Sequence, residues 1–489
     1  MNDLIAVLPE LLLIGSALAL LIYGAFSNSA LATARITNIS FAALVLAGLL
    51  ALFDLAALKQ PDASPQLLFG GLLAYDAMTA LGRALVFFTS AFGLWLAQAH
   101  ITRKGYERFE LPLLYILASV GMAMMISSND LMSLFIGIEL MSLSLYVIAA
   151  MRRDDLRATE AALKYFVLGA LSSGLLLYGM SLVYGFGGAT DFTMIAANIR
   201  EFGQVARAQG LQLDYNVGLL IGLVFVITGL AFKLSAVPFH MWTPDVYHGA
   251  PTPVISFFAT APKVSAVLLL IRILYQPFLD MSAQWQQVII VLALASMLFG
   301  SIAALRQKSL KRLMAYSSIA NIGFVLVAIA SASDFGYVAS MNYMIIYVIN
   351  VLGLFAVILM LRSDERPLDD IDSLAGLSKT RPAAALAMTI LLFSITGIPP
   401  LSGFFGKLYV FMAAIQQGLI WLAVLGLLAS VIAAVYYLRL VKLIYFDAPQ
   451  IKLDKEESRE RHYIAWGAAL FALLLIFIQN GLLARIALP

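Results

Sequence analysis

Long runs of apolar residues recur along the whole chain, separated by short polar stretches. A run of about 20 apolar residues is long enough for a helix to cross the hydrocarbon core of a membrane. The runs are continuous and do not alternate between apolar and polar residues, which favours helices over a β-barrel. The pattern predicts fourteen spanning helices with these coarse limits: 4–26, 36–58, 75–97, 111–128, 130–151, 160–184, 217–248, 252–274, 285–305, 310–331, 335–361, 383–415, 418–446 and 463–485.

Two of the predicted spans are longer than a membrane requires, and each contains a helix breaker. The seventh, at 217–248, contains Pro238, and the twelfth, at 383–415, contains the proline pair at 399–400. Proline removes a backbone hydrogen bond, and backbone freed at membrane depth is tolerated only where protein or water satisfies it. Interrupted spans at corresponding places in two halves of a chain indicate a transport site.

The spacing of the two breaks predicts how the chain is organised. They are five spans apart, and because five is odd, two copies of a five-span unit must have opposite orientations. We therefore predict N-terminal helices one to three at 1–110, a first five-helix repeat (spans four to eight) at 111–275, a second inverted five-helix repeat (spans nine to thirteen) at 285–446, and an inside loop with helix fourteen at 447–489. The predicted fold is an all-α polytopic membrane protein with broken helices seven and twelve.

Composition narrows the chemistry that the chain can carry. Of its 489 residues, 62% are hydrophobic and 12% are charged, whereas soluble domains carry about 25% charged residues. The absence of cysteine excludes iron–sulfur clusters and disulfides. The segment GFFGK at 403–407 lacks the first glycine and the Ser/Thr of a nucleotide-binding loop. We expect no cofactor or metal in this chain, so the energy for any work comes from a gradient or from partner subunits.

The distribution of basic residues predicts the orientation of the chain. With fourteen spans both termini lie on one side, and most lysines and arginines in the connections lie on the opposite side. Because inside loops carry the excess of positive charge, the N- and C-termini are expected on the outer side.

A few charged residues lie within the apolar runs rather than between them. A charge at the centre of a bilayer costs about 2.5–3.5 kcal/mol on insertion scales, so such residues usually face a bundle interior and form pairs or pathways. One of them is an acid, Glu139, which lies about 13 Å from the start of its helix. The basic members are Arg83, Lys164, Lys233, Lys263 and Lys407.

Lys233 is the best candidate partner for Glu139. Desolvation disfavours a charged ammonium group and a nearby carboxylate favours it, so moving the carboxylate would switch the amine between holding and releasing a proton. The break after Lys233 would admit water to this site. The alternative is a stable ion pair that locks two helices together.

Three further residues are candidates for a proton path. Lys263 follows Pro262 at a central depth, where its side chain cannot easily reach either surface. His240 lies next to the first break and could relay protons near neutral pH, or it could simply hydrogen-bond freed carbonyls. Lys407 follows the second break and would serve the opposite half-channel of an inverted repeat.

Two of the basic residues have stronger structural alternatives. Lys164 lies about 10 Å beyond Arg157, so its amine could extend to the inside surface instead of joining a proton path. Arg83 has no obvious role and could pair with Asp76. Span ten contains polar residues that could order a water wire or could bond their own backbone: Tyr316, Ser317, Ser318 and Asn321.

Three segments resemble one known family. FKLSAVPFHMWTPDVYHGAPTPV at 232–254, LKRLMAYSSIANIGF at 310–324 and GIPPLSGFFGKLYVF at 397–411 are similar to the antiporter-like membrane subunits of respiratory complex I and their Mrp-type antiporter relatives. The family has three large branches, L, M and N. The L branch is longer and the M branch has glutamate where Lys407 stands, so the chain most resembles the N branch. Asn321 stands where relatives often have histidine.

The resemblance implies a function and a setting. The family positions fall on Glu139, Lys233, Lys263 and Lys407, with Lys164 and His240 in support. The family translocates protons as a non-redox part of NADH:quinone oxidoreductase, so flavin, iron–sulfur clusters and quinone are expected in partner subunits. Expected partners are other membrane-arm subunits and lipids, with no nucleic acid, in a bacterial inner membrane. The alternatives are an Mrp-type cation/proton antiporter without redox partners and a purely structural spacer.

Overall fold

The structure is a computed structural model of the chain, and it describes residues 3–27, 30–60, 64–104, 108–152, 154–210, 215–363, 366–454 and 458–478. Helices dominate it. The longer ones are α2 (Leu8–Phe26), α3 (Ala30–Leu58), α4 (Ala77–Lys104), α5 (Glu110–Ser127), α6 (Leu131–Ala149), α7 (Leu156–Gly187), α8 (Phe192–Ala208), α9 (Val217–Leu234), α12 (Ala261–Tyr275), α13 (Ser282–Leu305), α14 (Leu310–Ala330), α15 (Asp334–Ile358), α17 (Pro382–Thr396), α18 (Ser402–Gln416), α19 (Ile420–Phe446) and α20 (Arg459–Ile478).

Short segments connect the long helices. The helical ones are α1 (Asp3–Ala6), η1 (Phe69–Gly71), α10 (Trp242–Gly249), α11 (Thr252–Phe258), η2 (Leu279–Met281), η3 (Ile371–Leu374) and α16 (Leu377–Thr380). Two antiparallel pairs of very short strands complete the structure: β1 (Gln66–Leu68) with β2 (Leu73–Tyr75), and β3 (Arg362–Ser363) with β4 (Arg366–Pro367).

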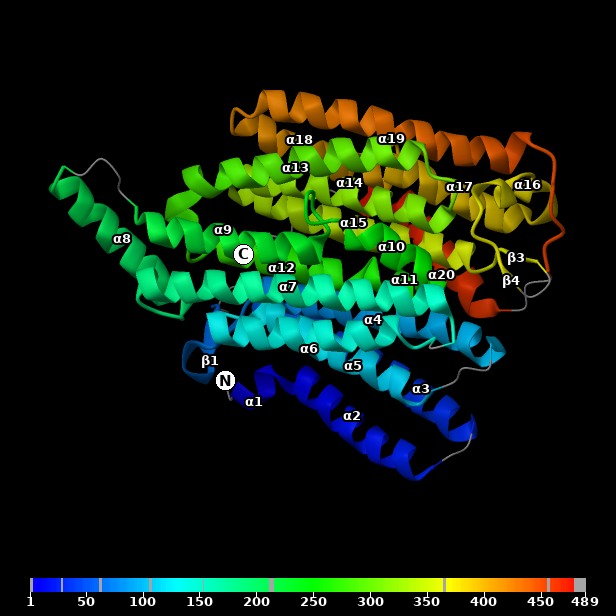
Figure 1. Cartoon of the computed structure of the whole chain (residues 1–489), viewed down its shortest axis with the longest axis horizontal. Helices are drawn as coiled ribbons and strands as arrows, with labels where there is room; N and C mark the ends of the chain where they lie inside the picture. The colour runs from blue at the N-terminus through cyan, green and yellow to red at the C-terminus, as the bar shows by residue number, and fades with distance from the viewer. Residues whose placement is uncertain are drawn as a thin grey trace.

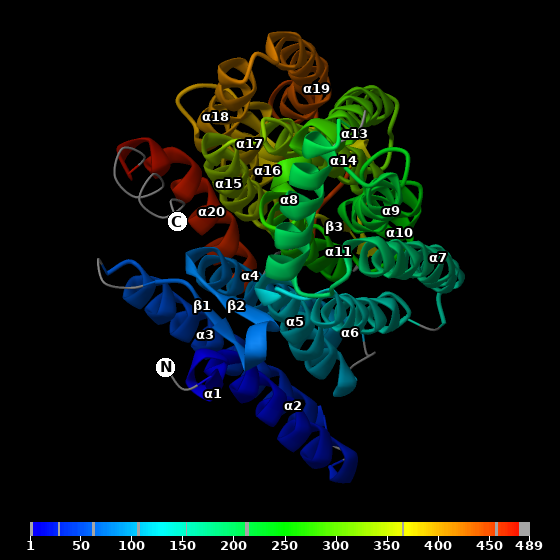
Figure 2. The same ribbon diagram turned by 90° about the vertical axis from the view of Figure 1, so that its left-hand side faces the viewer.

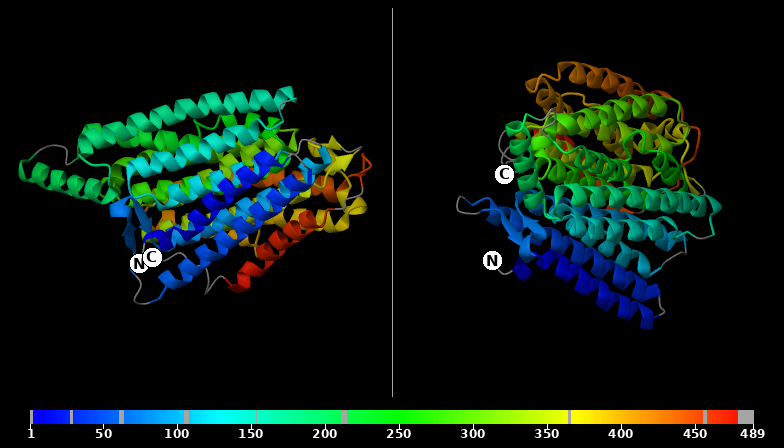
Figure 3. Two further views of the ribbon diagram at one scale, coloured as in Figure 1. Left: turned by 90° about the horizontal axis from the view of Figure 1, so that it is seen from below. Right: turned by 60° about the vertical axis from the view of Figure 1, so that its left-hand side comes forward.

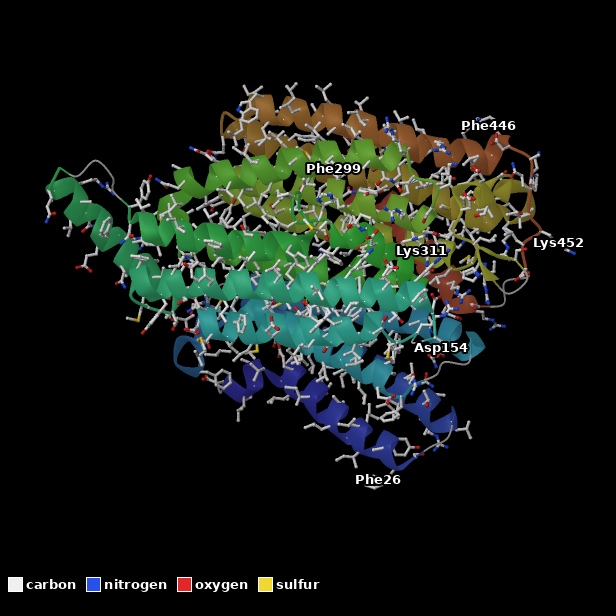
Figure 4. All side chains as sticks on the ribbon, in the orientation of Figure 1. Phe26, Asp154, Phe299, Lys311, Phe446 and Lys452 are labelled. Atoms are coloured by element: carbon white, nitrogen blue, oxygen red, sulfur yellow. The ribbon has the colours of Figure 1, made fainter. Side chains whose placement is uncertain are left out.

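The long helices lie side by side along one axis (Figure 1). Within the described residues, 12 helices are long and apolar enough to cross a membrane, which confirms an all-helical polytopic membrane protein. In Figure 1, α8 and β1 lie at the left end of the bundle, and α16, β3 and β4 lie at the right end. Asp154 and Lys452 lie toward that right end, whereas Phe26 and Phe446 lie at the margins of the bundle (Figure 4).

The structure shows both of the predicted interruptions. The first follows the end of α9, where Ser235 takes a left-handed conformation (φ 63°). The second follows the end of α17, where Gly397 does the same (φ 92°) before α18 begins at Ser402. At each site the left-handed residue ends the helix and turns the chain, the usual way a helix terminates.

A third interruption was not predicted. The expected continuous helix at 252–274 is divided into α11 and α12 at residues 259–260. Pro262 lies in the first turn of α12. Amides in the first turn of a helix have no carbonyl partner within the helix, so the absence of an N–H on proline costs no hydrogen bond there. The prediction of two broken spans was therefore incomplete.

The interior of the bundle is formed by α12, α14 and α15, which are almost completely buried. The N-terminal helices α2 and α3 form an outer layer against α4 and α5 (Figure 2) and leave many apolar side chains exposed. Seen from below (Figure 3, left), α20 lies at the edge of the bundle, where it packs mainly against α15 and α17.

The amphipathic helix α8 was also not predicted. It lies across one end of the bundle (Figure 2) and buries Phe192, Ile195 and Ile199. Arg200 on its exposed side forms an ion pair with Asp280 of η2 at 2.7 Å. Its apolar residues are three and four apart and do not form a membrane-length run, so a search for spanning helices overlooks it.

Candidate functional site

Lys233 lies in the last turn of α9, with its side chain buried in the bundle. Its Nζ donates to the hydroxyl of Ser142 at 2.7 Å and to that of Tyr146 at 3.4 Å. Both hydroxyls lie on α6, four residues apart, so one face of α6 supplies the polar surroundings of the amine. Among the described side chains, no carboxylate lies within 4.0 Å of Lys233. Lys233 and Glu139 therefore form no direct ion pair; a neutral hydroxyl contacts the amine, and Glu139 acts on it through space.

Glu139 lies one helical turn before Ser142 on α6, and it is partly buried. Its Oε1 is buried and has no hydrogen-bond partner. Ile136 and Leu143, on the neighbouring turns, are more than half exposed. Glu139 therefore lies at the edge of the outward face of α6, close to the polar surroundings of Lys233 but not joined to its amine.

Lys263 connects the first break to α12. Its side chain is 1% exposed, and its Nζ donates to the carbonyl of Leu234 at 3.2 Å and to the hydroxyl of Ser235 at 3.3 Å. Leu234 is the last residue of α9, so the ammonium group lies at the negative end of that helix dipole. Ser235 also accepts a hydrogen bond from Thr243 of α10 at 2.6 Å. One serine thus joins the two halves of the broken span to the buried lysine.

Lys407 occupies the corresponding position at the second break. Its Nζ donates to the carbonyl of Thr396, the last residue of α17, at 2.7 Å and to the hydroxyl of Ser430 of α19 at 2.8 Å. The same Nζ lies 4.8 Å from the centre of the Phe324 ring. Both breaks therefore place a buried ammonium group on the carbonyl that ends the preceding helix, with a serine hydroxyl as second partner.

His240 lies between α9 and α10, next to the first break. Its ring packs against Phe299 of α13 at 4.6 Å between centroids, and its Nδ1 is buried without a hydrogen-bond partner. Phe299 is labelled on α13 in Figure 4. The structure therefore places His240 beside the break, and none of its contacts joins it to Lys233 or Lys263.

Lys164 lies in an exposed ion-pair network. Its Nζ is 2.8 Å from Glu160 and 3.0 Å from Asp245 of α10, and Asp245 is also 3.1 Å from Arg312 of α14. The side chain of Lys164 is 43% exposed. This placement agrees with the alternative that the amine extends to the surface, and it separates Lys164 from the buried lysines.

The sequence analysis overlooked a polar face of α15 that meets span ten. Tyr343 donates to Asn321 at 2.7 Å, and the hydroxyls of Tyr347 and Ser318 lie 2.7 Å apart. Asn321, Tyr343 and Tyr347 line a cavity of about 10 Å³ with Asn350, whose amide nitrogen and oxygen are buried and have no hydrogen-bond partner among the described residues. A cavity of this measure holds about one water molecule.

A signal for that face was present in the sequence. Tyr343, Tyr347 and Asn350 are spaced by four and three residues, the spacing of one helix face. The cavity also includes Gly403, which belongs to the first turn of α18 after the second break. Hydroxyl and amide groups therefore extend from span ten to the start of α18.

Arg83 does not pair with Asp76. Its Nε lies 2.7 Å from Glu10 of α2, and its second nitrogen donates to the carbonyl of Ala6 at 3.0 Å. Asp76 instead accepts two hydrogen bonds from Arg272 of α12, at 2.9 and 3.0 Å. Arg83 therefore fastens the N-terminal helices to α4, a structural role rather than a place in the proton path.

No cluster of three or more possible metal-ligating side chains occurs in the described part of the chain. The amines of the buried lysines donate to hydroxyl and carbonyl groups. Such neutral partners are compatible with an amine that gains and loses a proton. The lysines do not suit metal binding, because an ammonium group repels a cation.

The chain matches a family model described as "NADH:quinone oxidoreductase/Mrp antiporter, TM" over residues 128–433. The chain is 50% identical to NADH-quinone oxidoreductase subunit N of Parvibaculum lavamentivorans over 448 residues, which cover 91% of this chain and 88% of that protein. It is 49% identical to the protein of the same name in Rhodospirillum rubrum over 462 residues, covering 94% of this chain and 92% of that one.

Two solved structures are similar along almost the whole chain. A chain of respiratory complex I from Thermus thermophilus has a TM-score of 0.82 and 28% identity, covering 98% of this chain and 99% of that one. A chain of the Mrp complex from Dietzia has a TM-score of 0.85 and 21% identity, covering 99% and 96%. The second likeness concerns the fold alone.

Proposed function

This chain belongs to the NADH:quinone oxidoreductase/Mrp antiporter family of membrane subunits, and from this premise we propose that it is the N-type, proton-translocating subunit in the membrane arm of an NADH:quinone oxidoreductase. It takes part in this enzyme without redox chemistry of its own. Flavin, iron–sulfur clusters and quinone are held by partner subunits, and protons cross the membrane through the present chain.

One observation carries the proposal. Two interrupted helices each end on a carbonyl that accepts a hydrogen bond from a buried lysine, Lys263 at Leu234 and Lys407 at Thr396. A structural spacer gains nothing from two such sites, since each buried charge is costly and each break removes helical hydrogen bonds. A proton carrier needs both, because the break admits water and the amine exchanges the proton.

The proton path begins at the pair formed by Glu139 and Lys233. We take the separation of their charges as roughly 8 Å, the pitch of one helical turn from Glu139 to Ser142 plus the hydrogen bond from Lys233 to Ser142. At an effective dielectric of about 20, that separation gives about 2 kcal/mol of interaction. A neighbouring subunit that changes the charge at Glu139 thereby changes the proton occupancy of Lys233 roughly 30-fold.

Lys263, the polar cavity beside Asn321 and finally Lys407 continue the path through the second half. His240 serves as a side entry, and Lys164 acts at the inside mouth through its ion pair with Asp245. The positions of these groups support the order, since the cavity includes Gly403 at the second break.

The finer organisation follows the same proposal. The chain forms fourteen spans, with inverted five-helix repeats at 111–275 and 285–446, N-terminal helices at 1–110, and a loop and last helix at 447–489. Both termini lie on the outer side of a bacterial inner membrane, and other antiporter-like and small helical subunits lie alongside. The collection of α8 and β1 at one end and α16, β3 and β4 at the other supports two distinct membrane faces.

The test is the substitution Lys233→Ala in the complete enzyme. We expect the assembled complex to lose most of its NADH-driven proton pumping, measured by the quenching of a pH-sensitive dye in inverted membrane vesicles. Normal pumping by an assembled Lys233→Ala complex would support a structural spacer instead.

The runner-up function is a cation/proton antiporter subunit without redox partners. The fold likeness to the Mrp complex allows it, but the relatives at 49–50% identity are named subunit N of NADH-quinone oxidoreductase. Purification of the chain from native membranes distinguishes the two functions. Co-purification with flavin- and cluster-bearing subunits supports the first, and co-purification with antiporter subunits alone supports the second.

A further inference from the structure

A groove of about 440 Å³ runs along the bundle between α4, α15 and α20. Aromatic and aliphatic side chains line most of it, and the hydroxyl of Thr89, midway along α4, already donates to the carbonyl of Leu85 at 2.6 Å. The groove therefore offers an elongated apolar surface whose remaining polar side-chain groups, on Trp95 and Tyr463, lie at one end.

The groove is too short for a spanning helix of a neighbouring protein. It extends along α4 from Trp95 to Leu85, and along α20 from Tyr463 to Phe471. Ten residues of helix cover about 15 Å, half of the roughly 30 Å hydrocarbon core. A partner helix would need the full thickness and a width of about 10 Å. One acyl chain of a single leaflet needs only half the thickness and much less width.

The two ends of the groove differ in chemistry. Trp95 and Tyr463 lie at one end, and Arg459, one turn before Tyr463, is exposed there. The first turn of α20 at this end thus presents the exposed Arg459 beside one acid, Glu460, which is only partly exposed. Aromatic residues mark the membrane interface, and basic residues near it attract anionic headgroups.

We propose that this groove binds an anionic phospholipid, with one acyl chain between α4 and α20 and its phosphate group at the Arg459 end. The acyl chain lies against α4, α15 and α20, whose side chains line the groove. The site does not depend on the proposed proton path, because it shares no residue with that path.

A pair of glycines gives a matched test. Gly467 lies in the groove on α20 and Gly15 lies on the exposed side of α2; an added Cβ would meet no other atom within 4 Å at either position. A leucine at Gly467 occupies the space of the acyl chain, whereas a leucine at Gly15 only enlarges the outer surface. Gly467→Leu and Gly15→Leu variants of the whole enzyme are purified in detergent and mixed with phosphatidylglycerol that carries a photoreactive group on its acyl chain.

We expect peptides of α4 and α20 to be labelled in the parent enzyme and in Gly15→Leu, and labelling to fall about tenfold in Gly467→Leu, equivalent to about 1.4 kcal/mol. Phosphatidylcholine with the same acyl label should compete poorly with phosphatidylglycerol.

Two results would overturn the proposal. One is equal labelling of the two glycine variants, which would mean that lipid contacts the groove no more than any outer surface. The other is a photoreactive residue placed at position 467 that crosslinks to a neighbouring subunit instead of to lipid, since a protein would then occupy the groove.

Discussion

The hydroxyl of Ser142 is the group most closely coupled to Lys233, so its removal tests the proposed proton path directly. Ser142→Ala deletes one oxygen atom and leaves the carbon framework unchanged. The hydroxyl now accepts a hydrogen bond from the Lys233 amine at 2.7 Å and donates to the carbonyl of Ile138 at 2.6 Å. Tyr146, at 3.4 Å from the amine, is too distant to replace it.

The expected magnitude follows from the charge on the donor. A hydrogen bond from a charged group contributes about 1.5–3 kcal/mol. Its loss disfavours the protonated amine of Lys233 by roughly 10- to 150-fold relative to the neutral amine. If proton transfer passes through protonated Lys233, pumping by Ser142→Ala falls by about tenfold or more.

The assay compares proton uptake with electron transfer in the same inverted vesicles. Dye quenching reports pumping, and native gels report the amount of assembled complex. Ser144→Ala is the matched control, because Ser144 is also buried on α6 and donates to the carbonyl of Leu140 at 2.8 Å, but within the described residues it forms no hydrogen bond with a lysine. Equal pumping by the two variants, at equal assembly, would refute the role assigned to the hydroxyl of Ser142.

Three further predictions concern other parts of the structure. Lys164→Ala removes exposed ion pairs at the inside mouth that are worth about 0–1 kcal/mol, so pumping in vesicles should fall by no more than about fivefold; a complete block in an assembled complex would contradict the surface placement. Gly397→Ala places a side chain on a residue in the left-handed conformation, with its Cβ 3.0 Å from the side chain of Lys407. The folding free energy should become less favourable by about 1 kcal/mol or more, and the Tm of the complex should fall. Arg83→Met leaves Glu10 as a buried charge without its partner, at a cost of about 3–5 kcal/mol; adding Glu10→Leu should restore much of the lost assembly, and no restoration would argue against this pairing.

The general architecture could be predicted because a membrane imposes severe rules on the backbone. Every buried amide must be paired within the segment, so a long apolar run is almost always a helix. Proline inside such a run predicted the breaks after α9 and α17. The third break, at 259–260, was missed because Pro262 lies early in α12, where a proline is also compatible with a continuous span that begins nearby.

Partners of the charged residues could not be predicted in the same way. The amine of Lys233 was expected to contact the carboxylate of Glu139 on α6. In the structure it contacts the hydroxyl of Ser142, one turn further along α6. Arg83 was expected to pair with Asp76. In the structure Asp76 pairs with Arg272, and Arg83 pairs with Glu10. A lysine or arginine side chain reaches several helices, and only the packing of those helices selects among the acceptors.

The sequence by itself determined the class of protein, most of its helices, the two predicted breaks, the family and the short set of charged residues placed deep in apolar runs. Tertiary structure alone decided which faces are inside, which residues meet, and where a cavity or groove remains. The physical reason is that lipid and protein interior are both apolar: α2 and α14 are similarly hydrophobic around their circumference, yet the first is largely exposed and the second almost entirely buried. In a water-soluble protein, polar residues identify the exposed face of each helix. In a membrane protein the lipid-facing side is also apolar, so shape complementarity and a few hydrogen bonds determine which helices pack together.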